Sequence, residues 1–279
     1  MKTITSKDGT TIAYDQTGTG PPLVLVDGAL NSRVFGLNGP LAPILADRFT
    51  VVTYDRRGRG DSGDTPPYAV QREIEDLAAV IDVVGGPAYV YGISSGAGLA
   101  LEAASAVPAK VAKLALYEPP FVVDGTRPPV PAGAVGQVTG LLARGRRGAA
   151  VKLFLREDAQ VPAMVVALMP LMPAWAKLKA AAHTLPYDLT IMDGGQQGRP
   201  LPAGRWASLT APTLVIAGGK SPAWLQNAAL AVAQALPGAS HQTLPGQTHI
   251  VKPKPLAPVL AEFFTSAPGN RSASRKTGQ

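Results

Sequence analysis

The sequence contains no cysteine and only three histidines among its 279 residues. Without cysteine the chain can form neither disulfides nor thiolate metal sites. This fits a reducing compartment, so we expect a cytoplasmic protein. The histidines His183, His241 and His249 are scattered without the spacing of metal ligands, and we expect no bound metal. Any imidazole chemistry has to come from one of these three side chains.

Long apolar runs are also missing. Residues 1–5 lack the hydrophobic stretch of a signal peptide, and the most apolar run, residues 163–172, is interrupted by Pro170. We therefore expect no membrane association. Charged residues make up 16% and hydrophobic residues 46% of the chain, which indicates a globular protein with a sizeable core.

The formal net charge of +7 comes partly from one end of the chain. Residues 267–279 contain Arg271, Arg275 and Lys276 but no acidic residue, and their composition predicts a disordered basic tail. Removing these three charges leaves +4 on residues 1–266, spread without a basic stripe. We therefore expect no nucleic-acid partner. We expect a small-molecule substrate, and no oligomeric state is predicted.

Hydrophobic patterning predicts strands that alternate with helices. Asp8-Gly9 lies between residues 2–6 and 10–15 and indicates a β-hairpin. The later strands are short continuous apolar runs, as in strands buried on both faces of a sheet. We expect them at residues 23–26, 50–54, 89–91, 111–117, 212–217 and 240–244, with helices at 34–45, 70–84, 99–106, 224–236 and 255–265. The fold class is therefore α/β, with a mostly parallel central sheet flanked by helices.

Residues 121–210 interrupt this alternation. The segment is rich in proline, contains helical patches at 148–156 and 174–182, and shows no convincing strand. We interpret it as a helical lid inserted into a single domain of residues 1–266.

The pattern G-x-S-x-G occurs at Gly92, Ser94 and Gly96, between a predicted strand and a predicted helix. A serine on such a tight turn has its hydroxyl pushed clear of the sheet, and side chains at the flanking positions would collide. The helix that begins there offers free N–H groups to a developing oxyanion. This context makes Ser94 the candidate nucleophile.

A second glycine pattern, G-x-G-x-x-G at residues 58–63, invites a dinucleotide-binding interpretation. That interpretation requires a helix to begin on the glycines, whereas Pro66 and Pro67 follow them closely. We therefore expect no bound cofactor.

The order of these motifs resembles the α/β-hydrolase superfamily from Thr3 to Phe264. The resemblance rests on the hairpin, a strand followed by Asp27-Gly28, the run YDRRGRGDSG at 54–63, the serine motif, and Gly246-x-x-His249 before the last helix. It implies the α/β-hydrolase fold. Serine at the nucleophile position differs from the aspartate of the epoxide-hydrolase and dehalogenase branches.

The resemblance also implies partners for Ser94. His249 lies in the loop where the family places its catalytic base. The usual acid, an aspartate after the strand at 212–217, is replaced here by Ser221. Some members instead place the acid at the end of the preceding core strand, which corresponds to Glu118. We expect Glu118 to orient His249.

An oxyanion hole is implied at the backbone N–H groups of Ala29 and Ser95. The family's His-Gly pair before the first of these donors is replaced by Asp27-Gly28. A carboxylate near an oxyanion opposes it unless the carboxylate is protonated, paired or turned away. Asp27 is therefore either a structural hydrogen-bond acceptor or a proton-transfer group in altered chemistry.

These residues predict a cofactor-free, esterase-like serine hydrolase that acts on an ester-like or other acyl substrate. The departures at Asp27 and Ser221 keep two alternatives open. One is a lyase, cyclase or acyl-transfer reaction on the same fold, and the other is a ligand-binding pseudo-hydrolase.

Overall fold

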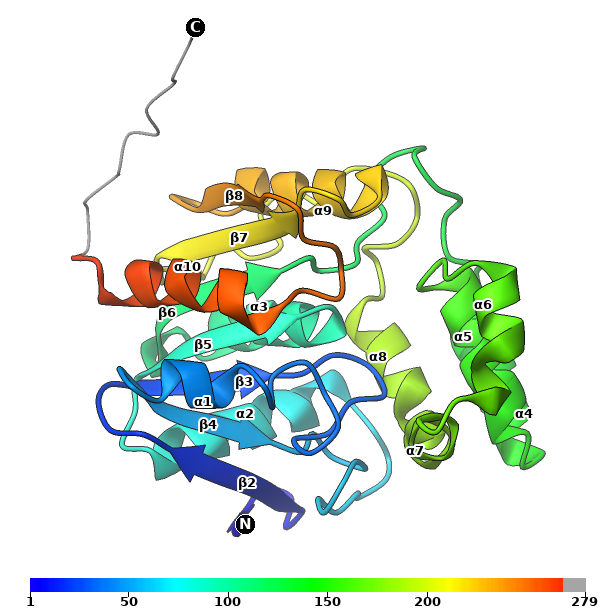
Figure 1. Cartoon of the computed structure of the whole chain (residues 1–279), viewed down its shortest axis with the longest axis horizontal. Helices are drawn as coiled ribbons and strands as arrows, with labels where there is room; N and C mark the ends of the chain where they lie inside the picture. The colour runs from blue at the N-terminus through cyan, green and yellow to red at the C-terminus, as the bar shows by residue number, and fades with distance from the viewer. Residues whose placement is uncertain (268–279) are drawn as a thin grey trace, which may run out of the picture.

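The computed structural model describes residues 1–267, and its strands form one eight-stranded sheet (Figure 1). The strands lie in the order β1-β2-β4-β3-β5-β6-β7-β8. β1 and β2 form the predicted antiparallel hairpin, β2 also runs antiparallel to β4, and the other pairs are parallel. The α/β class with a mostly parallel sheet is therefore confirmed. The strands are β1 (Lys2–Thr5), β2 (Thr11–Thr17), β3 (Pro22–Val26), β4 (Thr50–Tyr54), β5 (Ala88–Ile93), β6 (Val111–Tyr117), β7 (Thr213–Gly218) and β8 (Ser240–Leu244).

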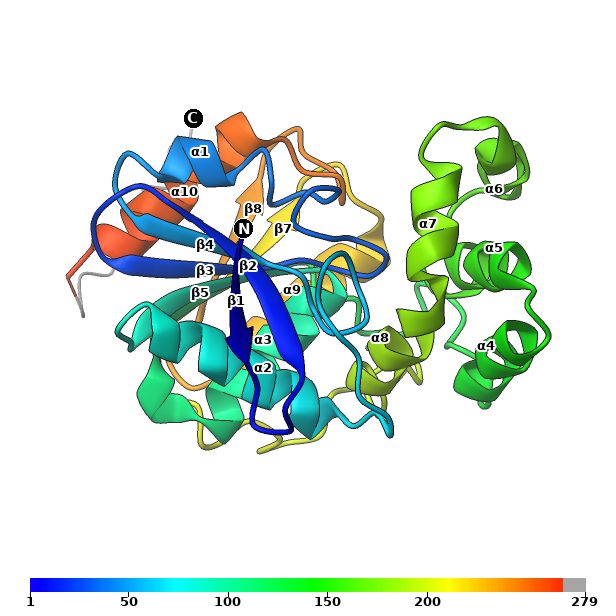
Figure 2. The same cartoon turned by 90° about the horizontal axis from the view of Figure 1, so that it is seen from below.

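Helices cover both faces of the sheet, as Figures 1 and 2 show. One face carries α1 (Ala42–Leu45) and α10 (Pro253–Thr265), and the other carries α2 (Val70–Val83), α3 (Ser95–Ala106) and α9 (Ala223–Ala235). Successive residues of β3 enter opposite cores. Leu23 and Leu25 join the core beneath α1 and α10, whereas Val24 and Val26 join the core beneath α2, α3 and α9. This two-sided burial explains the continuous apolar runs of the sequence.

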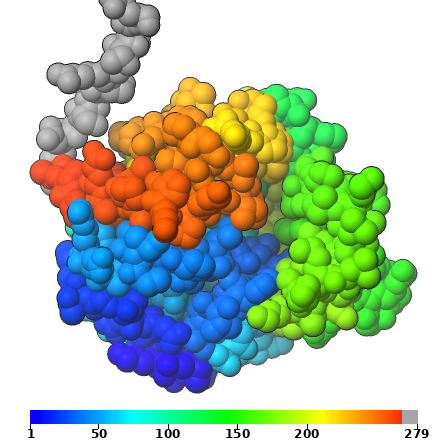
Figure 3. Space-filling view, viewed as in Figure 1, coloured from blue at the N-terminus to red at the C-terminus, as the bar shows by residue number. Residues whose placement is uncertain are grey.

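A layer of helices, here called the helical insertion, lies between β6 and β7 in the chain. It forms a lobe at one side of the sheet (Figures 1 and 2; green in Figure 3). Its core contains residues of α4, α5 and α8 together with Leu30 from the loop after β3. The helices are α4 (Ala134–Ala143), α5 (Arg147–Glu157), α6 (Ala163–Leu168), α7 (Trp175–Ala181) and α8 (Leu185–Ile191), with 3₁₀ turns η2 (Met169–Leu171) and η3 (Ala182–Thr184); a further turn, η1 (Pro108–Lys110), precedes β6.

The helix expected at residues 34–45 is the main error of the sequence prediction. Only its last turn, α1, is helical, and residues 31–41 form an irregular loop instead. The side chain of Asp27 accepts a hydrogen bond from the N–H of Leu37, and Gly36 lies against this carboxylate. A side-chain acceptor that binds the backbone in this way competes with helix formation.

The remaining differences concern helix boundaries and number. α3 begins at Ser95, four residues earlier than expected, and α4, α6 and α8 were not predicted as helices. Within residues 1–267 no single helix is long and apolar enough to span a membrane; residues 163–171 and 175–191 reach that length only together, across a bend of 102°. The predicted disordered tail lies outside the described residues from 268 onward.

Candidate active site

Ser94 occupies a sharp turn between β5 and α3. Its φ of 57° and ψ of −131° lie outside the regions that non-glycine residues prefer, so the turn is strained. The flanking glycines are required by close packing. A Cβ at Gly92 would lie 2.5 Å from the carbonyl oxygen of Gly96, and a Cβ at Gly96 would lie 2.5 Å from that of Asp27. The G-x-S-x-G pattern is therefore a steric requirement of this backbone.

Hydrogen bonds join the carboxyl ends of three neighbouring strands. The N–H of Ser94, after β5, donates to the carbonyl of Tyr117 at 3.0 Å. The N–H of Glu118, after β6, donates to the carbonyl of Ile216 in β7 at 3.0 Å. Because the carboxyl ends of parallel strands share one edge of the sheet, the candidate nucleophile and the candidate acid lie on adjacent strands.

Glu118 and His249 form a direct contact at this edge. Oε2 of Glu118 lies 2.7 Å from Nδ1 of His249, and Oε1 accepts a hydrogen bond of 2.6 Å from the N–H of Gly218. The Glu118 side chain is fully buried, whereas 32% of the His249 side chain is exposed. With Nδ1 held by the carboxylate, Nε2 is the ring nitrogen left to exchange protons. Within residues 1–267 no hydrogen bond joins Ser94 to His249, a contact that often tightens only when substrate is bound.

The loop that carries His249 is held by hydrogen bonds to its backbone carbonyls. The hydroxyl of Tyr117 donates to the carbonyl of Thr248 at 2.7 Å. The N–H of Lys220 donates to the carbonyl of Gln247 at 2.8 Å. The imidazole therefore belongs to a loop that is held in place by β6 and by the segment that follows β7.

The other two histidines lie away from this cluster. His183 is in η3, where its Nδ1 contacts the carbonyl of Ala180 at 3.0 Å. His241 is in β8, paired with Val215 of β7, and burial lowers the pKa of its imidazole. Neither side chain contacts a carboxylate among the described hydrogen bonds and ion pairs, so His249 is the candidate base that the geometry favours.

One candidate oxyanion donor, Ser95, follows Ser94 in the chain, and the other, Ala29, follows Gly28, which packs against Ser94. Ser95 is the first residue of α3, and Gly28 packs so closely that a Cβ there would lie 3.0 Å from Cβ of Ser94. In the part of the chain that the structure describes, no hydrogen bond uses the N–H of Ala29 or of Ser95. Both N–H groups are thus available to an oxyanion.

Asp27 is engaged in the irregular loop that follows β3. Its Oδ1 accepts hydrogen bonds of 3.3 Å from the side chain of Asn31 and from the N–H of Leu37. Burial raises the pKa of the carboxyl to about 6, although these hydrogen bonds and the charge of Arg59 act in the opposite direction. The hydrogen bonds fit the structural interpretation of Asp27 and the raised pKa fits the proton-transfer interpretation, so both stay predictions.

The glycines at 58–63 belong to a turn that wraps closely around the buried carboxylate of Asp55. A Cβ at Gly60 would lie 2.2 Å from Oδ2 of Asp55, and the next helix, α2, begins only at Val70. The loop instead sends the guanidinium groups of Arg56 and Arg59 into the protein interior, where both are almost fully buried.

These buried arginines were not anticipated as functional residues. Arg56 forms a bidentate ion pair with Glu73 of α2, with distances of 2.6 and 2.8 Å. Arg56 and Arg59 both contact Asp188 of α8. The sequence did contain a signal for these ion pairs. Three arginines follow a buried strand in one loop, and acidic residues occur at 73 and 76 on the next helix.

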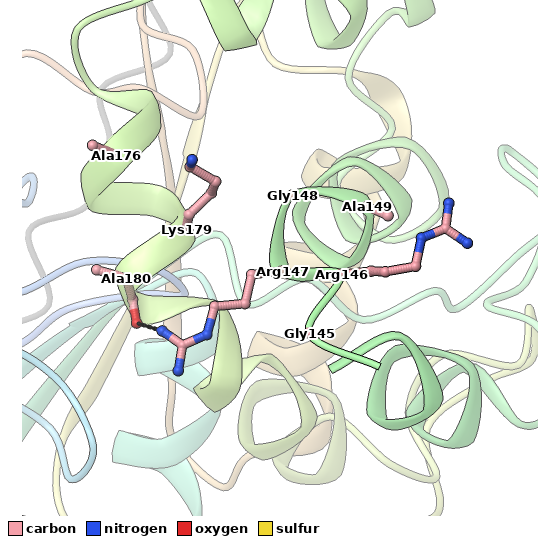
Figure 4. Close-up of a pocket in the computed structure, with 8 residues that line it drawn as sticks. All are labelled: Gly145, Arg146, Arg147, Gly148, Ala149, Ala176, Lys179 and Ala180. Carbon is pink, nitrogen blue, oxygen red and sulfur yellow. Dashed lines mark hydrogen bonds between the residues drawn. The ribbon is translucent and has the colours of Figure 1, made fainter. Parts of the chain in front are cut away.

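A hollow of about 550 Å³ lies elsewhere, between the α4–α5 turn and α7 (Figure 4). Arg146, Arg147 and Lys179 line it, and Arg147 donates to the carbonyl of Ala180 at 3.3 Å. None of the candidate catalytic side chains reaches this hollow, so it is not the serine site. Within residues 1–267 no group of three or more acidic or histidine side chains is arranged to hold a metal ion.

Comparisons with known proteins bear on the family and the fold of the chain. A family model described as "Alpha/beta hydrolase family" matches residues 18–258. The crystal structure of an alpha/beta hydrolase from Sphaerobacter thermophilus is 53% identical, covers 95% of this chain and 100% of its own, and superposes with a TM-score of 0.88. A putative non-heme bromoperoxidase, BpoC, from Mycobacterium tuberculosis is 25% identical over 91% of this chain and 98% of its own length. A thermophilic esterase from Thermogutta terrifontis is similar in fold, with 21% identity, a TM-score of 0.70, and coverage of 94% of this chain and 97% of its own.

Proposed function

Because the chain belongs to the alpha/beta hydrolase family, we propose that it is a cofactor-free serine hydrolase acting on an ester-like or other acyl substrate. Ser94 attacks the acyl carbon, and Nε2 of His249 takes the hydroxyl proton and passes it to the leaving group. Water then attacks the acyl-enzyme with the same imidazole as base. Glu118 keeps the imidazole in the required tautomer and stabilises its protonated form.

The tetrahedral intermediates carry a negative oxygen, which the N–H groups of Ala29 and Ser95 stabilise in this proposal. Donors that are already oriented require little reorganisation when the charge develops. The helical insertion lies beside the sheet edge that carries Ser94, and we assign it the role of a lid that bounds the acyl pocket (Figure 1).

The observation that carries the proposal is the contact of 2.7 Å between Glu118 and His249, at the edge where strained Ser94 emerges. An imidazole held by a buried carboxylate, at the sheet edge that also carries such a serine, suits nucleophilic catalysis. The hydrogen bonds that Asp27 accepts from Asn31 and Leu37 support a structural role for this carboxylate, and we propose no second function.

A fluorophosphonate probe and a panel of p-nitrophenyl esters test the proposal. The wild-type protein should be labelled rapidly and should hydrolyse at least one ester. Ser94→Ala should abolish labelling and lower kcat by several orders of magnitude, because the remaining oxyanion contacts cannot replace a nucleophile.

The matched control is Ser105→Ala, on the same helix, whose hydroxyl contacts Ser208 at the surface. This variant should be labelled like the wild type. An unlabelled wild-type protein would overturn the proposal in favour of a pseudo-hydrolase. Full ester turnover by Ser94→Ala would also exclude a serine mechanism.

A further inference from the structure

Asp188 of α8 is a buried carboxylate with three hydrogen-bond partners outside the helical insertion. It accepts hydrogen bonds from Nη2 of Arg59 at 2.7 Å, from Nη1 of Arg56 at 2.8 Å and from Oγ of Ser95 at 2.7 Å. Only 1% of its side chain is exposed. Burial by itself raises its pKa, but the charges of Arg59 and Arg56 outweigh burial and hold the pKa below the usual value, so the group is ionised.

The first branch of this network leads to Ala29. Nη1 of Arg59 donates to the carbonyl of Gly28 at 2.8 Å. The peptide between Gly28 and Ala29 is trans, so the N–H of Ala29 points away from Arg59. Arg59 therefore fixes the direction of one candidate oxyanion donor, and Nη1 of Arg56 supports the same segment by donating to the carbonyl of Asp27 at 3.3 Å.

The second branch leads to Ser95 itself. The hydroxyl of Ser95 donates to Oδ1 of Asp188, and the N–H of Ser95 is the other candidate donor. Ser95 is the first residue of α3, where no earlier helical turn offers a carbonyl to its N–H. The hydrogen bond to Asp188 therefore restrains Ser95, whose N–H is not held by a helical hydrogen bond.

We propose that Asp188 is a positioning residue that orients both donors of the oxyanion hole, one through Arg59 and the other through Ser95. The inference rests on the proposed function, because it assigns those donors to a tetrahedral intermediate. Its physical basis is that donors aimed in advance at a developing charge stabilise the transition state more than the bound substrate. It also couples the helical insertion to the chemistry, because Asp188 belongs to the insertion and its partners do not.

Asp188→Asn is the direct test. It should lower kcat about a hundredfold, the effect of losing an oxyanion donor, and leave KM for a p-nitrophenyl ester within about threefold. The affinity for an aryl boronic acid, which forms a tetrahedral adduct with the serine, should weaken in parallel with kcat/KM. A carboxylate that only stabilised the fold would lower the melting temperature without this parallel loss.

Tyr187→Phe is the matched control. Tyr187 precedes Asp188 on α8 and donates to Oδ2 of Asp64 at 2.7 Å, so it also links the insertion to the main domain. Its phenylalanine variant keeps the ring that stacks on Tyr68 at 3.9 Å. This variant should lower the melting temperature slightly and leave both kcat and boronic-acid affinity at their wild-type values.

Two further variants keep the inference testable if Asp188→Asn fails to fold. The double variant Arg59→Met, Asp188→Leu replaces both charges by apolar side chains, a change that protein stability often tolerates at a buried ion pair. This variant should show the same loss of kcat. Ser95→Ala removes only the second branch and should lower kcat about tenfold.

Rapid labelling of Ser94 in the wild-type protein separates this inference from the proposed function. If the wild type is labelled but Asp188→Asn and Ser95→Ala both keep wild-type kcat and boronic-acid affinity, the positioning role is wrong and the serine mechanism stands. If the wild type is not labelled, the proposed function itself fails.

Discussion

The carboxylate of Glu118 lies 2.7 Å from Nδ1 of His249, although 131 residues separate the two in the chain. The helical insertion, β7, α9 and β8 all lie between them in sequence. The contact forms because β6 and β7 are neighbours in the sheet and Tyr117 ties its own strand to the loop that carries His249. The predictions below test what this arrangement does.

Glu118→Gln should lower kcat by about 10³- to 10⁴-fold, because a neutral amide neither stabilises an imidazolium nor enforces the tautomer that accepts the serine proton. The amide oxygen can still accept from Gly218, so the melting temperature should change little. Steady-state kinetics on a p-nitrophenyl ester and a thermal melt give both readouts. A kcat within about tenfold of wild type would show that another group orients His249.

Tyr117→Phe should lower kcat by roughly tenfold, since the loop of His249 loses its hydrogen bond from the tyrosine hydroxyl to Thr248 and the imidazole is held less accurately. The matched control is Tyr91→Phe in the neighbouring strand, where the buried hydroxyl has no hydrogen-bond partner among the residues that the structure describes. That control should be as active and at least as stable as the wild type. Equal effects of the two substitutions on kcat would contradict the anchoring role.

Asp27→Asn should leave kcat within about threefold of wild type, because an asparagine oxygen can accept the same hydrogen bonds from Leu37 and Asn31. The comparison with Glu118→Gln in the same assay decides between the two carboxylates. A larger loss of kcat from Asp27→Asn than from Glu118→Gln would assign proton transfer to Asp27 and favour non-hydrolytic chemistry.

Titration of the Asp158 carboxyl should make the free energy of unfolding fall as pH rises. Asp158 is buried, and one of its carboxyl oxygens has no hydrogen-bond partner within residues 1–267. Burial raises the pKa of this carboxyl to about 7, partly offset by the charge of Arg127. A raised pKa means that the folded state binds the proton more tightly than the unfolded state. The contribution of Asp158 to the free energy of unfolding is therefore present below its unfolded pKa and is lost by about pH 7.

Asp158→Asn cannot ionise, so its stability relative to wild type should increase between about pH 4 and pH 8. Urea unfolding at the two ends of this range measures the difference. A difference that does not change with pH would mean that Asp158 titrates normally in the folded state.

The sequence alone determined the features that depend on near neighbours in the chain. The turn at Ser94 could be recognised because the strand, the two flanking glycines and the helix lie within about 20 consecutive residues. The strands could be recognised because residues buried on both faces of a sheet give continuous apolar runs. The helix predicted at residues 34–45 was wrong because the carboxylate of Asp27, which lies outside that segment, accepts a hydrogen bond from the backbone N–H of Leu37.

Only the tertiary structure decided which groups meet. Resemblance to a family could nominate Glu118, but its contact with His249 depends on the order of β5, β6 and β7 in the sheet. Nothing in the local sequence connects Asp188 to Arg59, 129 residues away, or to Ser95, 93 residues away. Buried charges find partners because leaving one unpaired in the interior is costly, and that requirement acts on the folded chain and not on the order of its residues.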